Sequence, residues 1–107
     1  MPKQGTIVLV PFPFTNLSAA KVRPALVLSA RPMKADIILA FISSRQKKNE
    51  YAVTIAPSSA NGLKVPSVII CGKIATLEKS VLLGELGTAD AKTVKQVKSK
   101  LAALLDL

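Results

Sequence analysis

Short apolar segments rich in β-branched residues recur through most of this chain, and proline, glycine or polar residues soon interrupt each of them. Such interruptions limit each segment to a strand, because proline and glycine break both helices and central strands. The expected strands cover residues 5–10, 25–29, 36–42, 51–55, 67–71 and 73–77, with residues 81–83 as a candidate further edge. Short strands at this close spacing predict a mainly β fold built as a small barrel.

The end of the chain has a helical period instead. One helical face carries the apolar residues Val94, Val97, Leu101, Leu104 and Leu105, and the other carries Lys92, Lys95, Gln96 and Lys100. Thr88 is the expected N-cap, and Asp90 complements the positive end of the helix dipole. We expect this C-terminal α-helix to pack on the barrel of its own chain rather than on a partner protein.

The residue types that are missing exclude several kinds of chemistry. The 107 residues, expected to form the single domain 1–107, contain no histidine and no tryptophan, and Cys71 is the one cysteine. A disulfide framework, a Cys/His zinc cluster and a histidine-dependent nucleophile are therefore excluded within one chain. Cys71 lies in an apolar strand, where a thiol is usually an inert small hydrophobic group.

The net charge points to a polyanionic partner. Lysine and arginine number 15 against 6 acidic residues, which gives +9. Nucleic acid, an acidic protein and an anionic membrane all attract such a charge. The longest apolar stretch, residues 37–42, is too short to span a bilayer, and the first residues do not resemble a signal sequence. We therefore expect a cytoplasmic protein with no membrane association.

The arginines lie at the ends of predicted strands. These are Arg23, Arg31 and Arg45, and the first fifty residues carry eight basic against two acidic residues. The arginine fork binds phosphate with two hydrogen bonds, which suits a phosphodiester ligand. Composition alone favours ordinary solvated surface charges. Ser43 and Ser44 end a strand, where a hydroxyl either bonds backbone or points into a site.

Two longer patterns resemble one known family. Gly5-x-Ile7-Val8-Leu9-Val10-x-Phe12-Pro13-Phe14, followed after a polar loop by Lys21-Val22-Arg23-Pro24-Ala25-Leu26-Val27-Leu28-Ser29, resembles the opening of the PemK/MazF toxin endoribonucleases. Ala40-Phe41-Ile42-Ser43, Ser67-Val68-Ile69 and Lys73-Ile74-Ala75-Thr76-Leu77 are similar to later segments of that family. The resemblance implies an SH3-like barrel of the MazF/CcdB type with a terminal helix. It further implies a homodimer that cleaves single-stranded RNA without a metal or other cofactor and is silenced by a cognate antitoxin.

The resemblance also assigns roles to residues. It implies that Arg23 and Ser43 are catalytic and that the loop at residues 15–22 gates the RNA groove. The residues assigned to RNA binding are Phe14, Asn16, Ser18, Lys21, Ser44, Arg45, Asn61 and Thr76. The chain departs from the family pattern where members commonly carry an arginine, in the strand at residues 68–70 or beside Thr76, where it has Ala75. The loss of that charge would weaken RNA binding or change the cleavage sequence.

RNA supplies its own nucleophile, the ribose 2′-hydroxyl, so a nuclease without histidine is chemically reasonable. Arg23 would stabilise the charge on phosphorus and Ser43 would donate a hydrogen bond to a phosphate oxygen, giving a 2′,3′-cyclic phosphate and a 5′-hydroxyl. The sequence identifies no proton acceptor. Two alternatives stay open: an inactive barrel that binds nucleic acid or antitoxin, and a gyrase-inhibiting toxin of the CcdB type. An antitoxin with an acidic, initially disordered tail would suit the same basic groove.

Overall fold

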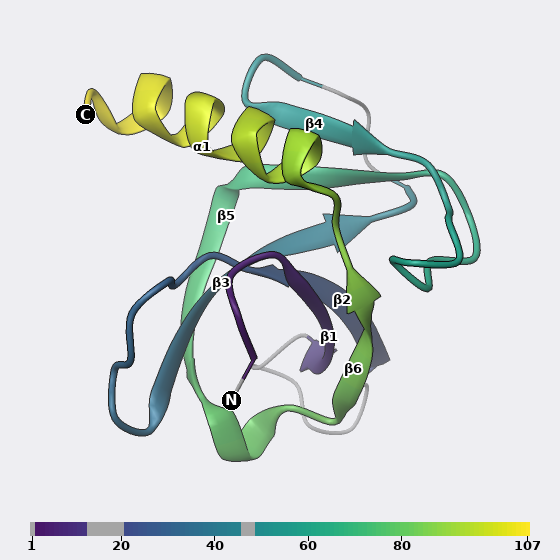
Figure 1. Cartoon of the computed structure of the whole chain (residues 1–107), viewed down its shortest axis with the longest axis vertical. Coiled ribbons are helices and arrows are strands. Elements are labelled where there is room, and N and C mark those ends of the chain that lie inside the picture. The colour runs from purple at the N-terminus through teal and green to yellow at the C-terminus, as the bar shows by residue number, and fades with distance from the viewer. Residues whose placement is uncertain (1, 13–20, 46–48) are drawn as a thin grey trace.

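One curled antiparallel sheet and a C-terminal helix make up the fold (Figure 1). The computed structural model describes residues 2–12, 21–45 and 49–107. The elements are β1 (Thr6–Phe12), β2 (Lys21–Val27), β3 (Asp36–Ser43), β4 (Ala52–Ile55), β5 (Ser67–Glu78), the 3₁₀-helix η2 (Lys79–Val81), β6 (Gly84–Thr88) and α1 (Ala91–Leu105). The strand order is β4-β5-β3-β2-β1-β6, and every pair is antiparallel. This half-barrel confirms the predicted mainly β fold with a terminal helix.

Alternating side chains fill two large core clusters, one on each face of the sheet, and a small third cluster contains Ala52, Val68 and Ile70. The first core cluster joins the sheet to α1 and contains Ile7, Leu26, Ala40, Ile42, Val53, Ile55, Leu63, Ile69, Cys71, Ala89 and Val97. The second core cluster, on the opposite face, contains Val8, Val10, Ala25, Val27, Ile37 and Leu39, with Phe41, Ala75, Leu77 and Leu82 packed against it.

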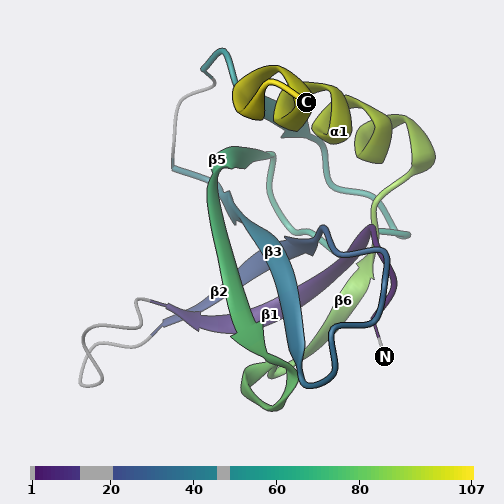
Figure 2. The same ribbon diagram turned by 90° about the vertical axis from the view of Figure 1, so that its left-hand side faces the viewer.

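The helix α1 packs against β4 and β5, across one end of the curled sheet (Figure 2). Val97 is 1% exposed within the first core cluster, which confirms that the apolar face covers the chain's own sheet. That face is shorter than predicted, because Leu104 and Leu105 remain exposed. The predicted N-cap Thr88 is wrong, since Thr88 ends β6 opposite Thr6. Asp90 caps the helix instead, accepting a 2.7 Å hydrogen bond from the backbone N–H of Thr93.

The predicted strands at residues 67–71 and 73–77 form one long strand, β5, which continues through Gly72. A step of two residues along β3, from Ala40 to Ile42, corresponds to a step of five residues along β5, from Ile74 back to Ile69. Three extra residues are therefore accommodated in β5, and such a bulge lets a strand bend without ending. β5 pairs with β3 along most of its length and with β4 at its start.

The predicted edge strand at residues 81–83 is also wrong. Residues 79–81 form η2, and the strand follows it at Gly84–Thr88. Leu86 is the one large apolar residue in that strand, so the sequence carries no strand pattern there. Gly87 is required by packing, because a Cβ at this position would overlap the backbone of Ala60 and Asn61. Within the described residues, no helix is both long and apolar enough to cross a membrane.

Candidate active site

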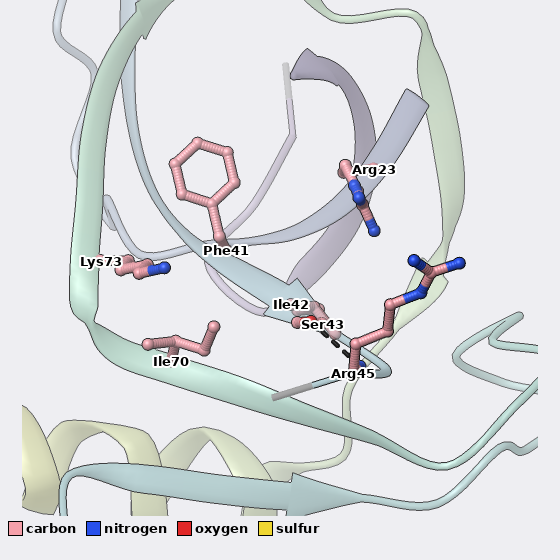
Figure 3. A pocket seen from close by; sticks show the side chains of 7 residues that line it. All are labelled: Arg23, Phe41, Ile42, Ser43, Arg45, Ile70 and Lys73. Atoms are coloured by element: carbon pink, nitrogen blue, oxygen red, sulfur yellow. Dashed lines mark hydrogen bonds between the residues drawn. The ribbon is translucent and has the colours of Figure 1, made fainter. Parts of the chain in front are cut away.

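A pocket of about 210 Å³ lies where β2, β3 and β5 diverge (Figure 3). Its lining residues are Arg23, Phe41, Ile42, Ser43, Arg45, Ile70 and Lys73. Three of these side chains are cationic and none is a carboxylate. The pocket therefore has the charge that suits an anionic ligand.

Pro24 explains why the sheet opens at this point. The sequence predicted that the strand starts after this proline, but β2 runs through it. The N–H of Leu28 donates to the carbonyl of Ile38 on β3 at 2.8 Å, so even-numbered residues of β2 direct their backbone groups toward β3. Pro24 faces the same way and has no N–H to donate. The β2–β3 ladder accordingly ends at the pair Ala25–Phe41.

Arg23 and Ser43 are brought together by this register. Ala25 lies opposite Phe41, so Arg23 and Ser43, each two residues further along, are opposite each other where the two strands separate. Both lie on the face of the second core cluster, because side chains two residues apart share a face. The pocket is thus the open end of that core, with an arginine and a serine in place of apolar residues.

Ser43 has its hydroxyl oriented by the local backbone. Its Oγ accepts a 3.1 Å hydrogen bond from the N–H of Arg45. A serine hydroxyl accepts and donates at once, so this bond leaves the Ser43 proton available to a ligand. The serine therefore combines both roles left open by the sequence, because it bonds backbone and also lines the pocket.

The Arg23 side chain points into the pocket from β2 (Figure 3). Its Nε is shielded from solvent and has no hydrogen-bond partner within residues 2–12, 21–45 and 49–107. A buried donor without an acceptor costs about 1–3 kcal/mol, and more when the group is charged. The oxygen of a bound anion would supply the missing acceptor.

Two lining residues, Phe41 and Lys73, were not identified from the sequence. Lys73 reaches the pocket because it lies in the β5 bulge and continues the row of Ala75 and Leu77, which pack on the second core cluster. Lys73 thus provides a positive charge close to the position where the expected family arginine is replaced by Ala75. Gly72 is the one local signal of the bulge, and the sequence pattern there predicts a strand end, whereas β5 continues through it.

The other predicted RNA-binding residues are dispersed. Phe14, Asn16 and Ser18, with most of the predicted gate, lie outside the described residues. Arg45 lines the pocket, whereas Ser44 lines a neighbouring pocket of about 370 Å³ that also contacts Arg23. Lys21 is exposed at the start of β2, and Thr76 is exposed on β5 outside both pockets. Arg31, the third strand-end arginine, lies at a different pocket, beside Lys3.

Asn61 is buried, although the sequence placed it among the RNA contacts. Its Oδ1 accepts hydrogen bonds from the N–H groups of Ser58 and Leu63, at 3.0 and 2.9 Å. Its Nδ2 donates to the carbonyl of Ala56 at 2.9 Å. With 5% of its surface exposed, the side chain shapes the turn before Gly62 and offers no edge to a ligand.

Metal-ligating and thiol groups do not gather in the part of the chain that the structure describes. No three His, Cys, Asp or Glu side chains lie together there. Cys71 is fully buried in the first core cluster. Burial raises the pKa of its thiol, and the Lys100 ammonium opposes that rise. Cys71 therefore acts as a small apolar core residue, as its strand predicted.

Comparison with known proteins gives the family. A model of the PemK-like, MazF-like toxins of type II toxin-antitoxin systems matches residues 3–105. No curated protein matches in a sequence search. The structure of MazF from Deinococcus radiodurans is 28% identical, with a TM-score of 0.78 over 99% of this chain and 97% of that chain. A MazE–MazF complex from the same organism is 26% identical, with a TM-score of 0.80 over 99% and 96%.

A third solved structure, at lower identity, shows the same fold. It is an endoribonuclease in complex with its cognate antitoxin from a mycobacterial species, and it is 22% identical with a TM-score of 0.80 over 100% of this chain and 97% of that chain. The family match extends over nearly the whole sequence, so it includes all the segments on which the resemblance was based. The chain belongs to the PemK-like, MazF-like toxins of type II toxin-antitoxin systems.

Proposed function

We propose that this chain is a sequence-specific endoribonuclease that cleaves single-stranded RNA without a metal ion and acts as the toxin of a type II pair. The observation that carries the proposal is the shielded Nε of Arg23, which lacks an acceptor in the described structure and points into a pocket beside Ser43. A phosphodiester oxygen is the acceptor that an arginine fork binds best. The names of the solved relatives support the same activity, since one is called an endoribonuclease.

In the proposed reaction, Arg23 and Ser43 act on the scissile phosphate. The ribose 2′-hydroxyl loses its proton as its oxygen forms a bond to phosphorus, and the 5′-oxygen gains a proton as its bond to phosphorus breaks, which gives a 2′,3′-cyclic phosphate and a 5′-hydroxyl. Arg23 stabilises the negative charge that develops on the phosphate oxygens, and Ser43 keeps its proton and donates a hydrogen bond to one of them. Donors held in place before the reaction stabilise a transition state more than solvent does.

Further RNA contacts are proposed outside the Arg23–Ser43 pair. Arg45 adds a second guanidinium to the pocket, and Lys21, Ser44 and Thr76 extend the RNA path over neighbouring surfaces. Phe14, Asn16 and Ser18, which lie outside the described residues, complete the proposed RNA contacts. Because phosphate contacts release counterions, RNA binding should weaken steeply as salt rises.

A cognate antitoxin with an acidic tail would occupy the same cationic pocket. We place the chain in the cytoplasm, as a homodimer of single-domain subunits.

The decisive experiment is end-mapping of cleaved RNA. The purified protein is incubated with a labelled single-stranded RNA mixture in excess EDTA, and the termini are sequenced and tested for cyclic phosphate. We expect cyclic-phosphate ends at one short recurrent sequence. Arg23→Ala and Ser43→Ala should lose this cleavage, whereas Arg31→Ala removes the same charge away from the pocket and should keep it.

Other outcomes of this experiment would replace the proposal. Intact RNA that is retained on a gel would indicate an inactive nucleic-acid-binding barrel. Intact RNA together with trapped gyrase would indicate an inhibitor of that enzyme. Cleavage that requires a divalent cation would contradict the metal-independent reaction.

A further inference from the structure

The pocket has two chemically different halves (Figure 3). Arg23 and Arg45 lie on one side of it, while Phe41 and Lys73 lie on the other. Ser43 lies between the two sides. The first half suits a phosphate, and the proposed reaction uses only that half. The second half combines an aromatic ring with a hydrogen-bond donor, and the reaction gives it no role.

Phe41 supplies the flat apolar surface of the second half. It is half-buried on β3, two residues before Ser43, and it packs against the second core cluster. A ring held by the core loses little conformational freedom when a ligand stacks on it. In single-stranded RNA, unstacked bases commonly bind on aromatic side chains in this way. Ile70 adds a further apolar wall beside it.

Lys73 supplies the polar group of the same half. Its ammonium has three donors and no acceptor, so it can hydrogen-bond only to acceptor atoms of a ligand. Uracil and guanine present a keto oxygen at the position where cytosine and adenine present an amino group. A lysine at the edge of a stacked base would therefore favour the keto bases. An amino group at that edge would meet the ammonium donor to donor, which adds discrimination.

We propose that this half of the pocket holds one unstacked keto base of the RNA, uracil or guanine, with Phe41 against its face and Lys73 at its acceptor edge. The proposal rests on the proposed function, because the base belongs to the RNA whose phosphate reaches Arg23. The whole pocket, at about 210 Å³, is smaller than the roughly 300–1,000 Å³ of pockets for drug-sized ligands, so this half has room for no more than one base. Lys73 is thus the specificity residue, and Phe41 supplies the stacking surface.

The test of Lys73 uses binding in a background that cannot cleave. Ser43→Ala protein is titrated with fluorescent hexamers of uridine and of cytidine, and anisotropy gives the two dissociation constants at several salt concentrations. We expect wild-type Lys73 to favour the uridine hexamer about tenfold, and Lys73→Met to bring the ratio close to one. Lys95→Met, an equal charge change on the exposed side of α1, should keep the ratio.

Two results would contradict the role proposed for Lys73. If Lys73→Met weakens both hexamers equally and lowers the slope of log affinity against log salt by about one, Lys73 contacts a phosphate and the proposal is wrong. An unchanged ratio with unchanged affinity would also overturn it. Methionine keeps the apolar stem of lysine, and melting curves for each variant confirm that it is folded.

Phe41 is tested by two substitutions in the same background. Phe41→Leu keeps an apolar group on the second core cluster but removes the ring, and we expect it to weaken binding of both hexamers about tenfold. Phe41→Tyr keeps the ring and should bind like the parent protein. Equal affinities for all three proteins would overturn the stacking role.

The wild-type cleavage map separates a failure of this inference from a failure of the proposed function. If the protein cuts RNA, but keto bases are not enriched at any position near the cut, the base pocket is wrong and the nuclease stands. If the wild-type protein neither cuts nor binds RNA, both are wrong. We expect one position near the cut to be restricted to uracil or guanine, and to lose that restriction in Lys73→Met.

Discussion

The turn around Asn61 and the pocket around Arg23 each hold a polar side chain that is shielded from solvent, but only the turn provides partners for it. Asn61 donates one hydrogen bond and accepts two, all with backbone groups nearby. Arg23 Nε has no partner among the described residues. Folding alone favours the first arrangement and opposes the second, since buried polar groups are normally paired. The Asn61 side chain thus stabilises the fold, whereas Arg23 Nε is placed to bind a ligand.

A site prepared for an anion carries a cost in stability while it is empty. The donors of Arg23 cannot be satisfied by the protein and still be available to phosphate. Arg23 Nε is the one buried side-chain nitrogen or oxygen atom without a partner among residues 2–12, 21–45 and 49–107, so the incomplete pairing found there lies at the pocket. Substitution of Arg23 should therefore lower activity and raise stability, whereas substitution of Asn61 should lower stability and leave activity unchanged.

Arg23→Met should give the largest effect. Methionine fills part of the space without a charge, so cleavage should fall by about 10²–10³, or roughly 3–4 kcal/mol of transition-state stabilisation. Removal of the unpaired donor should at the same time raise the free energy of unfolding by about 1 kcal/mol. For a domain of this size, that gain raises the melting temperature by about 4–8 °C. Gel assays of RNA cleavage and thermal melts measure the two quantities.

Two outcomes would contradict the proposed difference between Arg23 and Asn61. A destabilised Arg23→Met protein would mean that the arginine is paired in the folded state. Full cleavage by a folded Arg23→Met protein would remove Arg23 from the reaction.

Asn61→Ala should give the next largest effect, in stability. It removes three hydrogen bonds from a buried turn, so we expect a loss of about 2–4 kcal/mol. Chemical denaturation measures this loss, and RNA cleavage by the folded protein should be unchanged. Ser43→Ala is the matched comparison, because it should lose cleavage and keep most of its stability. If folded Asn61→Ala fails to cleave, Asn61 is the RNA contact that the sequence predicted.

Pro24→Ala should have a smaller effect, and it tests whether the proline opens the sheet at the pocket. Alanine supplies an N–H directed toward β3, so the ladder can extend past Ala25–Phe41 and narrow the gap in front of Ser43. We expect slower hydrogen exchange at the new amide and reduced cleavage. Stability should change little, because the new hydrogen bond offsets the greater freedom of the unfolded chain, each being about 1 kcal/mol. Rapid exchange at residue 24 would show that proline does not open the sheet.

Local pattern was enough to predict most of the fold. Residues 5–10 and 36–42 are continuous β-branched or apolar runs, and their strands lie within one or two residues of the expected bounds. The helix followed from its period. β6 was missed because two of its five residues are glycines, which have low strand propensity. Gly87 is required by its contact with the Asn61 turn, which no local pattern shows.

The candidate site was predicted only in part, for reasons of register. Arg23 and Ser43 came from the resemblance, and no local pattern shows that they lie opposite each other. Phe41 and Lys73 line the same pocket because of a bulge in β5, and this bulge depends on pairing between segments that are distant in the sequence. The Asn61-Gly62 pair is typical of an exposed turn, and its burial depends on β6 packing across it. The parts of the site that local patterns did not predict thus depend on pairing between segments that are far apart in the sequence.

The helix cap gives the smallest predicted effect, at an exposed site where the protein itself supplies the hydrogen-bond acceptor. Hydrogen bonds from Thr93 lower the pKa of Asp90 from its ordinary 3.8, because they favour the charged carboxylate. The cap therefore stabilises the fold fully above that ordinary value, and the contribution is lost as pH falls through the lowered pKa. Asp90→Ala should lower the melting temperature by a few degrees at pH 7, whereas Asp90→Asn should keep most of the cap. Melts from pH 7 to pH 2 should show a smaller decrease in stability for Asp90→Asn than for the parent, and equal decreases would mean that Asp90 does not cap α1 in its charged form.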